Sequence, residues 1–209
     1  MDGAGTSIDQ ADDVGAGPGA ARPMRADAVK NRQRILAAAA EVFASQGVSV
    51  PIDLVAERAG VGVGTLYRHF PTKDALFEAI VLTKLTGLIA TACAAADAED
   101  PERALFEFLG LFASEAAMKH DLFDALDTAG IDIKSRCSAS VDELQRGIDR
   151  LLRRAVEAGA VRDDVGADEI VSLVIGTCHA VERMRGSADS VQRLIGILCE
   201  GLRRVGAEG

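Results

Sequence analysis

Residues 51–73 read PIDLVAERAGVGVGTLYRHFPTK, and this stretch decides the fold. We predict a first short helix over Pro51–Ala59, because proline suits the first helical position, where its missing N–H costs nothing. Gly60 follows at the place where a left-handed residue commonly ends a helix. A second short helix is predicted over Val63–Phe70, before a proline. Two short helices joined through Gly60-Val61-Gly62 are typical of a helix-turn-helix.

The second of these helices has one apolar side and one side rich in polar groups. Leu66 and Phe70 are four residues apart, so both should face inward. We expect Val61 to pack back onto Ala56. The angle between the two helices should be fixed by the apolar contacts of Leu54, Val55, Ala59, Leu66 and Phe70. The outward residues are then Gly64, Thr65, Tyr67, Arg68 and His69.

These outward residues suit the surface of DNA. Arginine reads guanine, threonine and tyrosine bond phosphates or touch a thymine methyl group, and glycine lets two backbones approach closely. We therefore interpret Val63–Phe70 as a recognition helix for the major groove. The alternative is a helical hairpin that only packs against the rest of the protein.

Both flanks of the motif are predicted to be helical. Apolar residues at helical spacing run through Asp27–Gln46, and Gly47 ends that segment. After the motif, Thr72 can cap a long helix that extends to about Ala96, with Asp74 placed favourably in its first turn.

Residues Ala56–Phe77, AERAGVGVGTLYRHFPTKDALF, resemble the DNA-binding segment of the TetR (tetracycline-repressor) family, and the resemblance is dense over about Asp27–Leu82. It implies that Thr65, Tyr67 and His69 contact phosphates or base edges, and that Lys73 binds a phosphate. It also implies that three positions vary with the operator, namely Val63, Gly64 and Arg68.

The segment departs from the family pattern at two places. Many relatives carry a phosphate-binding Ser or Thr where the second helix starts, whereas Val50, Pro51 and Ile52 supply no hydroxyl. Serine is also frequent where Gly62 stands, so the recognition helix has a weaker N-terminal cap. These departures affect single phosphate contacts and leave the resemblance intact.

The remaining sequence predicts an all-α protein of about nine helices. No alternating strand pattern appears. Further helices are expected from Asp100-Pro101 onward, around Leu122–Thr128, from Ser138 or Ser140 to Gly159, over Ala167–Arg185 and over Ala188–Val205. We expect three parts: a disordered arm (1–24), a helix-turn-helix domain (25–80) and a helical domain for effector binding and dimerisation (81–209), the last implied by the resemblance.

The net charge of −9 is unevenly distributed along the 209 residues. Residues 1–21 hold four acids and no base, whereas residues 22–80 hold eight bases and six acids. An acidic remainder discourages non-specific adhesion and leaves recognition to the basic part. No signal peptide is visible, and no apolar run reaches the ~18 residues of a membrane span. We therefore expect a cytoplasmic protein without a membrane partner.

The last two predicted helices carry apolar residues that could pair across a two-fold axis. These are Ile170, Leu173, Val174, Cys178, Val181, Leu194, Ile197, Leu198 and Leu202. A homodimer is favoured because one short helix-turn-helix reads few bases. The alternative is that these residues belong to the intramolecular core.

The sequence does not locate an effector pocket. Apolar residues that could line one are Phe106, Phe108, Phe112, Met118, Phe123 and Met184, and possible polar contacts are His120, Asp124, Thr177 and His179.

The other class of function considered is a small helical enzyme or binding protein that uses the thiols, the His residues and the paired Asp163-Asp164. Cys178-His179 resembles a metal or nucleophile site, but adjacent helical residues point about 100° apart and no third ligand follows from spacing. No phosphate loop, metalloprotease motif or nucleophile elbow is present. We expect no catalytic residue, no metal and no cofactor. The prediction is a regulator, most simply a repressor released from a palindromic operator by a small effector, with an activator as the open alternative.

Overall fold

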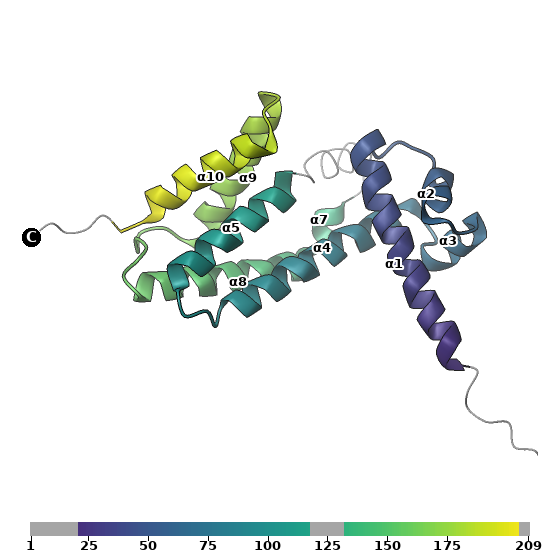
Figure 1. Ribbon diagram of the computed structural model, residues 1–209, viewed down its shortest axis with the longest axis horizontal. Helices are drawn as coiled ribbons and strands as arrows, with labels where there is room; N and C mark the ends of the chain where they lie inside the picture. The colour runs from purple at the N-terminus through teal and green to yellow at the C-terminus, as the bar shows by residue number, and fades with distance from the viewer. Residues whose placement is uncertain (1–20, 118–131, 205–209) are drawn as a thin grey trace, which may run out of the picture.

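Every regular element within the described residues, 21–117 and 132–204, is a helix in this computed structural model (Figure 1), which confirms the all-α prediction. The helices are α1 (Ala21–Gln46), α2 (Ile52–Ala59), α3 (Val63–His69), α4 (Lys73–Ala95), α5 (Pro101–Ala117), α7 (Ile133–Arg136), α8 (Ser138–Glu157), α9 (Ala167–Arg183) and α10 (Ala188–Leu202).

Some boundaries differ from the sequence-based ones. Helix α1 begins at Ala21, six residues before Asp27, so residues 21–24 of the predicted arm are helical. The four-residue α7 was not predicted; it starts where the Asp132 carboxylate accepts the Ser135 N–H at 3.0 Å. Residues 1–20 and the predicted helix Leu122–Thr128 lie outside the described residues.

The turn between α2 and α3 forms as its glycine predicts. Gly60 has φ 63° and ψ 41°, the left-handed conformation that only glycine adopts without strain. The N–H groups of Gly60 and Val61 bond the carbonyls of Glu57 and Ala56, each at 3.0 Å. At the other end of α2, Pro51 is an extended N-cap residue and not the first helical residue.

Helix α4 connects the helix-turn-helix to the rest of the protein (Figure 1). It packs against α1 near its start and against α5 and α8 further along. Thr72 caps it by accepting the Ala75 N–H at 3.1 Å, as predicted. By length and composition α4 could cross a membrane, and 44% of its most apolar stretch is buried inside the protein.

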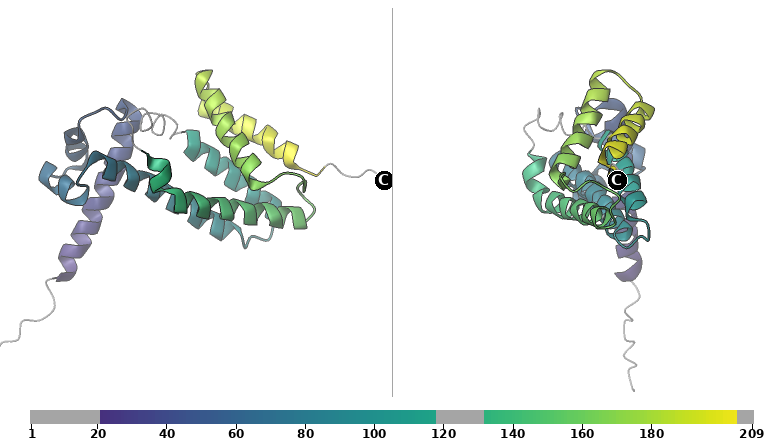
Figure 2. Two further views of the ribbon diagram at one scale, coloured as in Figure 1. Left: turned by 180° about the vertical axis from the view of Figure 1, so that it is seen from behind. Right: turned by 90° about the vertical axis from the view of Figure 1, so that its left-hand side faces the viewer.

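The C-terminal helices form two levels around α5 (Figure 2). Helices α4 and α8 pack along each other on one side of α5, and α9 and α10 cover its other side. Arg154 of α8 holds the segment that follows α4. Its guanidinium donates to the carbonyl of Ala96 and, at 3.0 Å, to the carbonyl of Ala98. The outward faces of α9 and α10 therefore lie on the surface.

Candidate nucleic-acid interface

Helix α3 buries one side and exposes the other, as its sequence predicts. Leu66 is 0% and Phe70 2% exposed, so both face the core. Tyr67 is 46% exposed and Val63 is 40% exposed, so both side chains reach solvent. Gly64 and Arg68 are also exposed, and Thr65 and His69 are half-buried at the edges. The predicted site residues of α3 thus share one accessible surface.

Leu54 does not fix the angle between the helices, which corrects the sequence-based expectation. Its side chain is 37% exposed. The contact of α2 with the core is made by Ile52, Val55, Ala56 and Ala59, which are all buried. Leu54 falls outside this face because α2 packs mainly on α1, from one side. Val29 of α1 is likewise exposed, at 57%, and not part of the core.

The arginines of this domain divide into structural and available ones. Arg58 donates to the Glu41 carboxylate at 2.6 Å, joining α2 to α1. Arg34 donates to the Gly60 carbonyl at 3.4 Å and supports the turn. Within residues 21–117 and 132–204, Arg68 makes neither an ion pair nor a side-chain hydrogen bond. Its guanidinium is therefore available to a base or a phosphate.

Lys73, for which the resemblance implies a phosphate contact, also has partners inside the protein. Its ammonium donates to the Val50 carbonyl at 2.6 Å and lies 5.8 Å and 5.9 Å from the ring centroids of Phe43 and Phe77. Partial burial lowers the pKa of Lys73. The side chain thus links the start of α4 to the segment before α2. This link stabilises the domain whether or not the ammonium also approaches a phosphate.

Replacing Lys73 by Met should lower the free energy of unfolding by about 1–2 kcal/mol, because the Val50 carbonyl loses a charged donor while the aliphatic packing stays. Equilibrium urea denaturation measures the change. Arg103→Met removes only an exposed pair with Glu107, and should leave the free energy of unfolding close to that of the native protein. Equal stability of Lys73→Met and the native protein would contradict the role of this hydrogen bond.

The same variant tests whether Lys73 also binds phosphate. If it does, the slope of log affinity for DNA against log salt concentration should become shallower by ~1 for each phosphate contact that is lost.

Arg32 was not singled out from the sequence, where it counted only as one of several bases. Its guanidinium carbon lies 5.2 Å from the centroid of the Phe70 ring, at the edge of the surface formed by α3. The contact joins residues 38 positions apart. A basic residue on an outward position of α1 was the available signal, but the sequence did not show which element it faces.

Both parts of this chain are similar to known proteins. Residues 35–80 match the family model for bacterial regulatory proteins of the tetR family, and residues 100–204 match that for the SbtR-like transcriptional regulator C-terminal domain. A crystal structure of a TetR transcription regulatory protein from Mycobacterium vanbaalenii is similar to 87% of this chain and all of that one, with 36% identity and a TM-score of 0.70. The chain belongs to the TetR family.

Other TetR-family proteins agree with this assignment. The regulator SCO0520 from Streptomyces coelicolor is 29% identical, with 84% of this chain and 99% of that one covered and a TM-score of 0.69. The regulator SrpR of Pseudomonas putida is 43% identical over 65 residues, 31% of this chain and 30% of its own length. A Staphylococcus aureus regulator is 40% identical over 67 residues, 32% and 36% of the two chains. The matched segment therefore spans only about a third of the length of these curated relatives.

TetR-family proteins are helix-turn-helix, DNA-binding transcriptional regulators and not enzymes, and this assignment separates the two classes that the sequence left open. Within the described residues, no group of three His, Cys, Asp or Glu side chains could hold a metal ion. Cys137, Cys178 and Cys199 are buried, and burial raises the pKa of each thiol, that of Cys199 to about 11. These thiols therefore stay protonated at neutral pH.

Proposed function

We propose that the protein is a homodimeric repressor, acting in the cytoplasm, that binds a palindromic operator and leaves it when a small molecule binds its C-terminal helices. The outward face of α3 carries this proposal. It presents an exposed tyrosine and an arginine that has no side-chain partner among the described residues, backed by the buried Leu66 and Phe70. A rigid helix with a polar outer side fits the major groove.

We assign DNA binding to the region 25–80 and effector binding to the region 81–209. Arg68, Val63 and Gly64 would face base edges, and Thr65, Tyr67 and His69 would contact phosphates or bases. Lys73, beside the Val50 carbonyl, would orient the start of α4 and reach a phosphate from there. In vitro selection from a random duplex library tests this proposal: the enriched sites should show two-fold symmetry.

Dimerisation is supported by the exposed apolar residues of α9 and α10. Ile170, Val174, Cys178 and Val181 are buried within the chain, so the intramolecular alternative accounts for those. It does not account for Leu173, Leu194 and Ile197, which are 53%, 41% and 67% exposed. An added Cβ at Gly176 or Gly201 would meet no atom within 4 Å, so these glycines leave room for a partner helix. Such a face suits a four-helix interface about a two-fold axis.

Ile197→Asp should convert the dimer into a monomer and abolish footprints with two-fold symmetry, because a buried unpaired carboxylate strongly opposes association. Multi-angle light scattering at micromolar concentration measures the mass. Leu111→Asp, at a 39% exposed position on α5, is the matched control and should leave the dimer intact. For the native protein, the centres of the two half-sites in the operator should be separated by one or more helical turns of DNA, at about 34–36 Å per turn. A native chain that is monomeric at micromolar concentration would refute the dimer.

Induction is supported by the continuity of α4. The Arg136 guanidinium donates to the Glu78 carboxylate at 3.0 Å, linking the region of α7 to the DNA-proximal end of α4. Further along, the Lys84 ammonium lies 3.1 Å from the Glu115 carboxylate of α5. A ligand that moves α5 or α7 would therefore move α4. Such a shift would change the separation of the two α3 helices in the dimer.

An effector should bind operator-free protein about 5- to 150-fold more tightly than operator-bound protein, because coupling between two sites is reciprocal and is typically ~1–3 kcal/mol. Compounds that raise the melting temperature are selected first. Each is then titrated by calorimetry with and without the selected operator. Equal affinity in both titrations would exclude coupling, and the protein would then be a constitutive DNA binder.

A further inference from the structure

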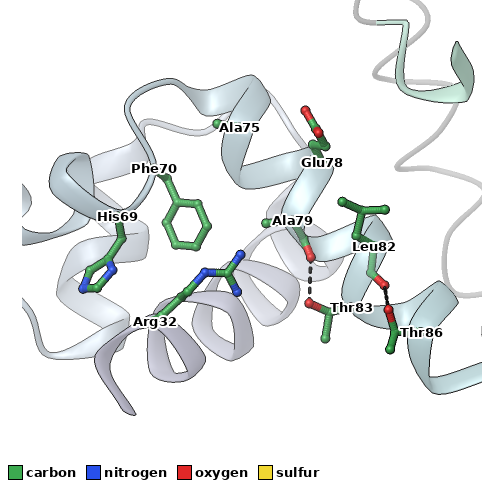
Figure 3. Close-up of a pocket in the computed structure, with 9 residues that line it drawn as sticks. All are labelled: Arg32, His69, Phe70, Ala75, Glu78, Ala79, Leu82, Thr83 and Thr86. Atoms are coloured by element: carbon green, nitrogen blue, oxygen red, sulfur yellow. Dashed lines mark hydrogen bonds between the residues drawn. The ribbon is translucent and has the colours of Figure 1, made fainter. Parts of the chain in front are cut away.

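A groove lies beside the recognition helix, and the proposed function assigns no ligand to it, although His69 and Glu78 are among its lining residues (Figure 3). It runs between α1, the end of α3 and the first turns of α4. Its lining residues are Arg32, His69, Phe70, Ala75, Glu78, Ala79, Leu82, Thr83 and Thr86. The groove is open to solvent along the side of α4, so an extended segment of chain could enter it.

The groove offers a positive charge that no internal acid neutralises. The Arg32 side chain points into it from α1 and lies over the Phe70 ring, 5.2 Å from its centroid (Figure 3). Within the described residues Arg32 makes no ion pair. Glu78 is the acid that lines the groove, and its carboxylate is bound to Arg136 at 3.0 Å. An incoming carboxylate would therefore find Arg32 available and Glu78 already compensated.

The floor of the groove is uncharged and combines small apolar side chains with two threonines. Ala75, Ala79 and Leu82 lie along one side of α4. The hydroxyls of Thr83 and Thr86 donate to the carbonyls of Ala79 and Leu82, at 2.7 Å and 2.8 Å, within the same helix. Each hydroxyl already donates its proton within α4, so its oxygen can only accept a further hydrogen bond. The two oxygens therefore suit the backbone N–H groups of a bound peptide. The groove thus fits an acidic peptide with small apolar side chains.

The chain itself contains such a peptide. Residues 1–20 carry Asp2, Asp9, Asp12 and Asp13 and no Lys or Arg, and the apolar Ile8 and Val14 lie beside these aspartates. This composition is complementary to the groove. An acidic segment next to a DNA-binding domain also opposes phosphate binding, because both compete for the same cations.

The distances allow the segment to reach the groove. Arg32 is eleven residues into α1 from Ala21, which is about 16 Å at 1.5 Å per residue. Asp13 precedes Ala21 by eight residues, and an extended chain of that length spans about 26 Å. Asp12 and Asp13 can therefore fold back alongside α1 to Arg32.

We propose that residues 1–20 dock in this groove as an internal competitor of DNA, with Asp12 and Asp13 beside Arg32 and His69. Docking places negative charge next to α3, so DNA must displace the segment before its phosphates approach this edge. Displacing the segment lowers the affinity for every duplex by the same factor, so an operator that gains base contacts is still bound, whereas a non-specific duplex that gains only phosphate contacts is held too weakly. The inhibitory part rests on the proposed DNA binding by α3; the docking itself does not.

Docking is tested without DNA by disulfide trapping in the full chain. Cys93, the exposed cysteine among the described residues, is first replaced by Ser. Ala11→Cys keeps all the aspartates and is combined with Thr83→Cys in the groove. The control combines Ala11→Cys with Thr91→Cys, an exposed threonine on α4 that lies outside the groove. Under mild oxidation the Thr83 pair should form an intramolecular disulfide faster than the Thr91 pair, and 0.5 M salt or Asp12→Asn/Asp13→Asn should remove the difference. Equal rates for the two pairs would overturn docking.

The inhibitory effect is tested with a non-operator duplex of random sequence. Removing residues 2–20, or introducing Asp9→Asn, Asp12→Asn and Asp13→Asn together, should raise affinity about three- to tenfold at low salt, as expected for one or two exposed ion pairs. Fluorescence anisotropy measures this, and unchanged melting temperatures confirm folding. Unchanged or weaker binding after truncation would overturn competition. If neither full-length nor truncated protein binds any duplex, the proposed function fails, whatever the trapping experiment gives.

Discussion

Tyr67→Ala should reduce operator affinity by about a hundredfold or more, because each base-edge or phosphate anchor contributes ~1–3 kcal/mol and a dimer loses two of them. The side chain is 46% exposed and points about 100° around α3 from the buried Leu66. Removing it leaves no cavity in the core. Anisotropy titration against the operator obtained by in vitro selection measures the loss.

The melting temperature separates a contact effect from a folding effect. Substitution at an exposed position should change stability by no more than about 0.5 kcal/mol, which is about 1–2 °C for a chain of this size. Tyr67→Phe is the matched control: retained binding would assign the contact to the ring, and lost binding to the hydroxyl. Native affinity in Tyr67→Ala would show that α3 is not the recognition helix.

Phe77→Ala should lower the free energy of unfolding by about 3–5 kcal/mol, the usual cost of removing a fully buried aromatic ring. Phe77 is 1% exposed at the junction where α1 meets α4. Its ring lies 4.7 Å from that of Phe43, centroid to centroid, at an interplanar angle of 41°. The melting temperature should fall by about 10 °C, and calorimetry measures it.

Two further variants test the origin of this loss. Phe77→Leu keeps most of the buried volume and should cost less than about 1.5 kcal/mol. Phe43→Ala removes the other ring, so the double variant should lose less than the sum of the two single variants. Strict additivity would mean that the two rings do not stabilise each other. A loss below 1 kcal/mol in Phe77→Ala would contradict the packing of this junction.

The helix-turn-helix and the outward face of α3 could be predicted from the sequence alone. The reason is that these features depend on neighbours a few residues apart. Gly60 sets the turn through its own φ, Thr72 caps α4 through the N–H three residues later, and Leu66 and Phe70 share a face because of the helical repeat. Local conformational preferences therefore decided which residues α3 presents to solvent.

Tertiary structure decided the features that join residues far apart in the chain. The sequence could not show that the Lys73 ammonium bonds the Val50 carbonyl, or that Arg32 lies over Phe70 beside an open groove. It also could not separate the buried Val174 from the exposed Leu173 and Ile197, since an apolar residue has the same pattern in a core and at an interface. The periodicity of a helix fixes which residues share a face. Only the packing of α1, α4 and α5 determines which face is buried against the rest of the protein and which face stays exposed.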